Sequence, residues 1–424
     1  MDEHWLAAAR DGDRDTVLDL LRALPEPVVA GTEGSALLRA AALGRRPEIV
    51  ELLVERGADA GRPWEGGVDP VSWAADYGAY EVLRALLIRS KEPVRKDSPQ
   101  QRALVVARAW LGLDPERELR RRLGVGRHGE AFVDRELVGG IDFQPTATLL
   151  RVTAPDGRYA EAELSHRAIV TFLERAVGIR PTRRDLVARA LHYAEPGSCD
   201  WGESLDAMTA RLDLAPTFTW ASAAIADESV DLRRFAADVL HAMSFEERPF
   251  RIAAVELLRG RLRVEPDPVA LDSAIGAFAA YSKDDANLSD VVRHARHPAA
   301  EVRLRVALLG SVGHPHRGGR FAPPPEVPVA LVELTTDPEG LVRAGALFTL
   351  AEGGIDGPEI RQAMAARLSD ENDEARLQAA AGLALLGDPR GISVFKQVAT
   401  TVEADTQAWW RVDTVSRILA AQPQ

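Results

Sequence analysis

The chain has 424 residues, of which 46% are hydrophobic and 27% charged, a composition typical of folded rather than disordered proteins. Its formal net charge of −12 argues against general nucleic-acid binding, which needs cationic side chains to displace counterions from phosphates. A single cysteine, no signal-peptide pattern at the start and no run of about 18 apolar residues together favour a cytoplasmic protein without disulfides or membrane spans.

A helix-turn-helix pattern recurs three times within residues 3–90. In each copy a glycine follows a short alanine-rich helix and precedes an apolar one, and Gly12, Gly44 and Gly78 are 32 and 34 residues apart. In the middle copy Pro47 suits a first helical position and Gly57 a left-handed helix end. The pattern resembles the ankyrin repeat, whose period is about 33 residues. We therefore expect about three ankyrin repeats in residues 1–96.

Four aromatic residues cluster at the tip and first helix of the third copy: Trp64, Trp73, Tyr77 and Tyr80. The resemblance implies that these positions line a binding groove, and large aromatic side chains are frequent anchors at interfaces. They are candidates for contact with a partner. The alternative for Trp73 is packing toward the helix that follows.

Residues 97–183 fit neither repeat and form a connecting segment. Helices are expected at about 101–111 and 115–123, the second capped by Asp114 and carrying four arginines, Arg122 and the three site candidates Arg117, Arg120 and Arg121. Residues 84–127 hold twelve Lys/Arg against five Asp/Glu. These arginines are candidates for an anion or partner site, and the alternative is ion pairing with acidic neighbours on solvated helix faces.

After an irregular stretch at 124–147, a β-hairpin is expected at about 149–164, around the turn Ala154-Pro155-Asp156-Gly157. Glu161 and Glu163 then share a strand face with Tyr159. Paired carboxylates can divide acid and base roles, but on an exposed hairpin they more often form a solvated face.

Residues 184–424 carry a second helical repeat. An aspartate followed six residues later by an arginine marks most copies, whereas His297 replaces the aspartate before Arg303 and Ser273 replaces the arginine after Asp267. The pattern resembles HEAT repeats of the short, phycobilisome-lyase-like type, in which these residues form a structural ladder between neighbouring repeats. The resemblance assigns that role to Asp227, Arg233, Arg303, Asp337, Arg343, Asp370, Arg376, Asp405 and Arg411.

A loop at 313–325 interrupts one repeat and contains His314, His316, Arg317 and Arg320, which could hold a phosphate or carboxylate. A structural zinc normally needs four ligands and only two histidines are near, so no metal or cofactor is expected. Cys199 follows His192 in a loop, but proximity in sequence does not make it a nucleophile.

The sequence thus predicts an all-α protein in which ankyrin repeats precede a HEAT-like α-solenoid, with a small β-hairpin between them. A cytosolic scaffold that binds a protein or peptide on its concave surface is the leading functional interpretation. The alternatives are an enzyme with its site in the HEAT-like concavity, lyase-like or acting on a phosphorylated or acidic substrate, and, less favoured, a HEAT-like DNA glycosylase or other nucleic-acid binder. The enzyme question stays open, leaning toward no.

Overall fold

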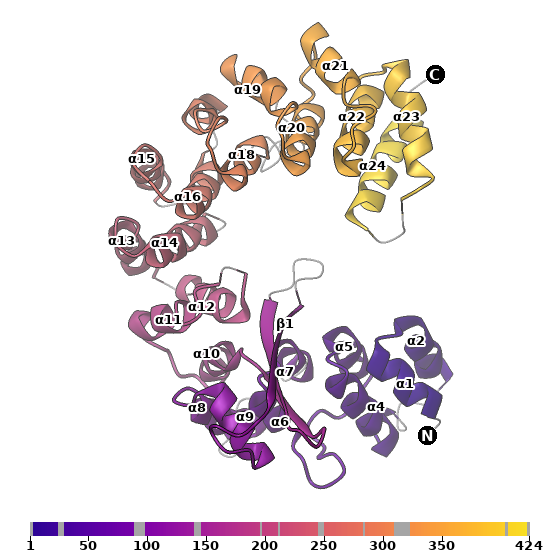
Figure 1. Ribbon diagram of the computed structural model, residues 1–424, viewed down its shortest axis with the longest axis vertical. Helices are drawn as coiled ribbons and strands as arrows, with labels where there is room; N and C mark the ends of the chain where they lie inside the picture. Colours follow the sequence, from indigo (N-terminus) through magenta and orange to yellow (C-terminus); the bar gives the residue numbers. More distant parts are fainter. Residues whose placement is uncertain are drawn as a thin grey trace. The chain divides into compact units, whose positions relative to one another are not determined.

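The computed structural model describes residues 3–23, 29–88, 98–139, 146–195, 197–210, 213–244, 250–282, 285–308, 323–402 and 406–421. The chain divides into two compact units, Met1–Arg211 and Leu212–Gln424 (Figure 1). Both units are built from helix pairs, and the first also contains a small antiparallel sheet. The predicted fold class is confirmed.

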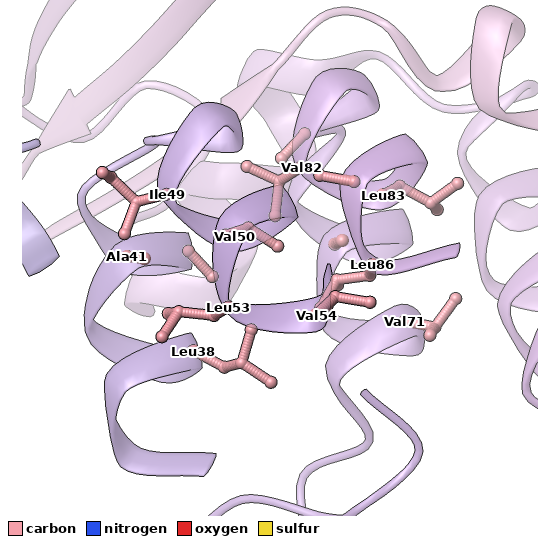
Figure 2. Packing of buried hydrophobic residues seen from close by; sticks show 14 of the residues in the cluster. Leu38, Ala41, Ile49, Val50, Leu53, Val54, Val71, Val82, Leu83 and Leu86 are labelled. Atoms are coloured by element: carbon pink, nitrogen blue, oxygen red, sulfur yellow. The ribbon is translucent and has the colours of Figure 1, made fainter. Parts of the chain in front are cut away.

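Unit 1 begins with three helix pairs: α1 (Glu3–Asp11) with α2 (Arg14–Ala23), α4 (Thr32–Leu43) with α5 (Pro47–Glu55), and α6 (Pro70–Tyr77) with α7 (Tyr80–Leu87). The apolar face of each second helix packs inward. Figure 2 shows Val50 and Val54 of α5 on the side of Val82 and Leu86 of α7, and Leu53 on the side of Leu38 of α4, within one continuous core. Neither helix of such a pair can bury its apolar face alone, so stacking of the pairs supplies the stability.

The turn that follows α4 does not depend on a left-handed glycine. Gly44 has ordinary helical angles, and the left-handed residue is Arg45, with φ of +57°. Glycine is needed at position 44 for another reason. A Cβ there would lie 2.0 Å from the carbonyl oxygen of Arg10, so only glycine lets the first two pairs approach this closely.

The connecting segment starts with α8 (Pro99–Trp110), which packs against α6, and α9 (Pro115–Leu123), which covers the sheet. The sheet has the order β1-β2-β3, with β1 at Phe132–Gly139, β2 at Thr146–Thr153 and β3 at Tyr159–Glu163. The β2–β3 hairpin was predicted. The expectation of an irregular stretch before it was wrong for β1, which pairs with β2 along its whole length.

Unit 1 ends with α10 (His166–Ala176), α11 (Arg183–Ala190) and α12 (Cys199–Thr209). Helix α10 packs against both α8 and α12, and α11 packs against α12. These contacts join α11 and α12 to unit 1, although the sequence interpretation placed them at the start of the second repeat array.

Unit 2 is a two-layer helical stack. One layer contains α14 (Val230–Met243), α16 (Pro268–Tyr281), α18 (Ala300–Ala307), α20 (Gly340–Glu352), α22 (Asp373–Leu385) and α24 (Gln407–Ala421), each packed on the next. The other contains α13 (Ala215–Ala224), α15 (Arg251–Leu262), α17 (Ser289–Val292), α19 (Glu326–Leu334), α21 (Pro358–Ala365) and α23 (Pro389–Ala399). A short 3-10 helix, η2 (Asp285–Leu288), precedes α17. In the described parts of both units, every helix is too short or too polar to cross a lipid bilayer.

Candidate binding surface

Aromatic side chains form a continuous row on the third ankyrin copy. Trp73 and Tyr77 lie one turn apart on α6, so their rings share a face and stack with centroids 5.1 Å apart. Trp64, from the loop before α6, packs on Trp73 at 5.4 Å. The loop is closed by a hydrogen bond from the Trp64 amide to the carbonyl oxygen of Val68, at 2.8 Å.

The row continues onto the sheet. The hydroxyl of Tyr77 donates to a carboxylate oxygen of Glu161 on β3, and Arg151 of β2 donates to the other oxygen at 2.6 Å. The Arg151 guanidinium lies over the ring of Tyr159, 5.1 Å from its centroid, and that ring is 58% exposed. Burial and the adjacent Glu161 carboxylate raise the pKa of Tyr77, which keeps its hydroxyl protonated as a donor. We call Trp73, Tyr77, Glu161, Arg151 and Tyr159 the aromatic row.

The base of the row is a close backbone contact between the ankyrin repeats and the sheet. Gly78 ends α6 with φ of +78°, and a Cβ at this position would lie 1.9 Å from the carbonyl oxygen of Glu163. Burial raises the pKa of the Glu163 carboxyl to about 7, Arg45 opposes that shift, and Glu161 adds to it. Sequence reasoning favoured a solvated face for both glutamates, whereas Glu163 is buried and Glu161 is held between Tyr77 and Arg151.

Two of the four predicted aromatic residues, Trp64 and Tyr80, are buried and lie beneath the surface that the other two help to form. The Tyr80 hydroxyl donates to Glu203 on α12 at 2.5 Å, and Glu203 also accepts from Arg175 at 2.7 Å. Trp73 and Tyr77 are only partly buried. The ring of Trp73 contacts those of Trp64 and Tyr77, and Trp73 also packs against the core cluster that includes residues of α8, so the alternative of packing toward the following helix stays a prediction.

The arginines of α9 are largely engaged with acidic neighbours. Arg120 pairs with Glu116 at 3.0 Å, and Arg121 pairs with Glu118 at 2.7 Å. Hydrogen bonds from Arg121 lower the pKa of the Glu118 carboxyl to about 2. Arg117 lies on the exposed side of the helix. This arrangement matches the solvated-helix alternative for Arg120 and Arg121 more closely than an open anion site.

The other candidates for chemistry are buried or lie outside the described residues. Cys199 is buried in α12, and burial raises the pKa of its thiol, which disfavours the reactive thiolate. The loop candidates His314, His316, Arg317 and Arg320 fall in the range 309–322, outside the described residues. Among the residues that are described, no group of three His, Cys, Asp or Glu side chains is arranged to hold a metal ion.

The ladder in unit 2 links consecutive repeats through arginine. Arg343 of α20 donates to both carboxylate oxygens of Asp370, at 2.9 and 2.6 Å, and to the carbonyl oxygens of Asp337 and Pro338. Arg303 of α18 binds Asp337 in the same way, at 2.6 and 3.0 Å. Each arginine therefore closes its own turn and holds the turn of the next repeat.

The ends of the ladder depart from this rule. Arg233 pairs with Glu265, at 3.0 and 2.8 Å, while Asp267, the expected partner by position, caps α16. Asp227 accepts the amide of Ser229 at 2.9 Å. Arg411 reaches back to Gln378 and to Glu352 and covers the ring of Phe348.

Arg376 binds the carbonyl oxygen of Asp370 and the carboxylate of Asp373. Its expected partner Asp405 lies outside the described residues. The carboxylates of Asp337 and Asp370 accept hydrogen bonds from the backbone amides of Glu339 and Asn372. Glu339 and Asn372 are the N-cap residues of α20 and α22. The first aspartate of the pattern is thus a turn residue and not the helix cap itself.

Two family models agree with this architecture. Residues 5–97 match the model of ankyrin repeats in three copies, and residues 327–410 match the model of HEAT repeats. No curated protein matches the chain significantly. Among solved structures, the X-ray structure of YibA from Escherichia coli is similar, with 18% sequence identity and a TM-score of 0.42 over 57% of this chain and 93% of YibA. The chain therefore carries ankyrin repeats in its first quarter and HEAT repeats toward its other end.

Proposed function

We propose that the protein is an interaction scaffold of the cytosol that binds another protein or a peptide through the aromatic row of unit 1. The observation that supports this most directly is the stack of Trp73 on Tyr77, both partly exposed on the first helix of the third ankyrin copy. Rigid aromatic rings lose little conformational entropy on binding, and they dominate the energetics of many interfaces. Repeat architectures commonly use such continuous surfaces for recognition.

The geometry also supplies polar specificity next to the apolar rings. Glu161 and Arg151 lie between Tyr77 and Tyr159, and their hydrogen bonds to each other and to Tyr77 fix their orientation. A surface that is preorganised in this way avoids part of the entropic cost of ordering side chains on association. Enzymatic use of the α9 arginines together with the loop at His314 has no comparable support, because that loop lies outside the described residues.

The test is comparative capture with the full chain immobilised, followed by an affinity measurement on the protein recovered. Trp73→Ala and Tyr159→Ala are compared with Trp410→Ala, an exposed tryptophan of unit 2 that serves as the matched control. We expect one partner that the control retains and both unit 1 variants lose, with affinity weakened about tenfold or more. Because Tyr159 is exposed, its variant should fold normally even if Trp73→Ala does not. Equal capture by all variants, or a bound metabolite in place of any partner, would overturn the proposal.

A further inference from the structure

Strand β1 has a free edge suited to receiving another strand. Its sheet neighbour is β2, with which it pairs continuously from Phe132 opposite Thr153 to Gly139 opposite Thr146, and its other edge is unpaired among the described residues. Six of its eight residues are exposed and none is buried. Phe132 and Leu137 are large apolar side chains with 69% and 64% exposure.

Proteins usually protect such an edge with charged side chains, proline, a bulge or a very short strand. Strand β1 has charged residues at its centre, Asp134, Arg135 and Glu136, but it contains no proline, has an unbroken register and is longer than β3. An edge left open in this way is a template for a partner strand, since its backbone N–H and C=O groups can extend the sheet.

The charges of β1 disfavour pairing with a second copy. Antiparallel pairing about a two-fold axis perpendicular to the sheet keeps side chains of one face together, so Asp134 and Glu136 can oppose only residues of their own face. A register centred on Arg135 sets Asp134 against Glu136 and Arg135 against itself. A register centred on Asp134 sets that carboxylate against its own copy, and a register centred on Glu136 does the same for the Glu136 carboxylate. Like charges directly opposite each other destabilise a strand pair, so every register centred on a charged residue is disfavoured for a second copy. A register centred on Leu137 avoids this repulsion but pairs only the residues from Arg135 to Gly139 of the strand.

The same charges favour a strand of opposite pattern. Asp134 and Glu136 lie two residues apart on one face and form no ion pair with any described residue. Asp134 lies opposite Arg151 in the register, but the Arg151 guanidinium is turned to Glu161. On the other face Arg135 pairs only weakly with Glu116, at 3.3 Å, and is more than half exposed.

From this pattern we propose that β1 binds an extended segment of a partner protein as a fourth, antiparallel strand. The segment carries two basic residues, two positions apart, opposite Asp134 and Glu136, and apolar residues opposite Phe132 and Val138. Main-chain hydrogen bonds supply the affinity, and the two acidic side chains select the sequence. The edge adjoins the aromatic row, because Asp134 lies opposite Arg151 in the register, but strand addition does not depend on the rings of that row and is tested separately.

The test uses a labelled peptide, Val-Thr-Lys-Glu-Lys-Thr-Ile, titrated against the full chain by fluorescence anisotropy. Two control peptides are matched to it: one exchanges the lysines and the glutamate for the opposite charges, and one carries N-methyl groups on alternate amides. We expect the first peptide to bind and each control to bind at least tenfold more weakly. Bound peptide should also slow hydrogen exchange in residues 132–139.

The double variant Asp134→Lys/Glu136→Lys supplies the reciprocal test. Both positions are exposed, so we expect the double variant to fold normally. It should reverse the preference and bind the charge-exchanged peptide at least tenfold more tightly than the original one. Equal binding of the N-methylated peptide would show simple charge attraction and overturn strand addition. Absence of binding by the original peptide at 1 mM, or dimers of the wild-type chain that the double variant abolishes, would overturn it as well.

Discussion

Arg343→Ala tests whether a buried ion pair holds neighbouring HEAT repeats together. The guanidinium and the Asp370 carboxylate have side-chain exposures of only 7% and 1%, and the arginine also satisfies two turn carbonyl groups. Removing it leaves the buried Asp370 with the amide donor of Asn372 and a looser ion pair with Arg367, 3.6 Å away. Removing one partner of a buried pair typically costs about 3–5 kcal/mol.

The matched control is Arg296→Ala. Arg296 forms the same kind of two-point pair with Glu333, at 2.6 and 2.9 Å, but the two side chains are 81% and 43% exposed. An exposed pair of this kind contributes at most about 1 kcal/mol because water and salt screen it. The two variants therefore differ in burial while the geometry of the pair is nearly the same.

Hydrogen exchange measured by mass spectrometry on peptides from α20 and α22 gives the local free energy of opening. In Arg343→Ala these amides should exchange on the order of a hundredfold or more faster, since each 1.4 kcal/mol corresponds to a factor of ten. The control should change the exchange of its own neighbourhood by less than about tenfold. Equal effects of the two substitutions, or unchanged exchange in Arg343→Ala, would refute the assignment of the buried pair as the link between repeats.

Two further predictions concern the contact between the ankyrin repeats and the sheet. Gly78→Ala and Gly124→Ala both place alanine at a left-handed helix end, but only at Gly78 would the new Cβ meet a carbonyl oxygen. We expect urea denaturation to show about 1 kcal/mol of lost stability for Gly124→Ala and about 3 kcal/mol or more for Gly78→Ala. Equal losses in the two variants would argue against the close contact. Glu163 has its folded-state pKa raised from 4.5 to about 7, so the fold holds a proton that the unfolded chain has already lost, and stability should fall by about 3 kcal/mol as pH rises from 4.5 to 7. Glu163→Gln should remove this contribution and leave a flatter dependence of the urea midpoint on pH; an unchanged slope would contradict burial as the cause.

Local periodicity was sufficient to predict both kinds of repeat, because the turn residues and the apolar residues of one copy lie within about 33 residues of each other. Strand β1 was missed for a physical reason. It is exposed on both faces at its centre, so burial imposes no alternation on the residues from Asp134 to Leu137. The ladder acceptor Glu265 was missed because it stands two residues before the aspartate that the pattern marks, and either side chain is chemically able to bind Arg233.

The aromatic row could be predicted only in part. The spacing of Trp73 and Tyr77 on one helix places them on a common face, and this is readable from the sequence. The hydrogen bond from Tyr77 to Glu161 joins residues 84 positions apart, so no local sequence pattern predicts it. The pairing of Arg151 with Glu161 could not be read from the predicted turn either. A turn at 154–157 would set Thr153 opposite Arg158 and Arg151 opposite Ala160, whereas in the structure Thr153 lies opposite Tyr159 and Arg151 opposite Glu161.

The contact of Gly78 with the carbonyl of Glu163 bears on how this array can grow or shrink during evolution. Repeat proteins change length by duplicating or losing internal copies, which succeeds when both faces of a copy fit another copy. The third ankyrin copy meets a sheet on its far side, through a contact that admits only glycine and a tyrosine matched to one glutamate. Copies can therefore be gained or lost before α6 without disturbing that junction. The third copy and the sheet must be inherited together.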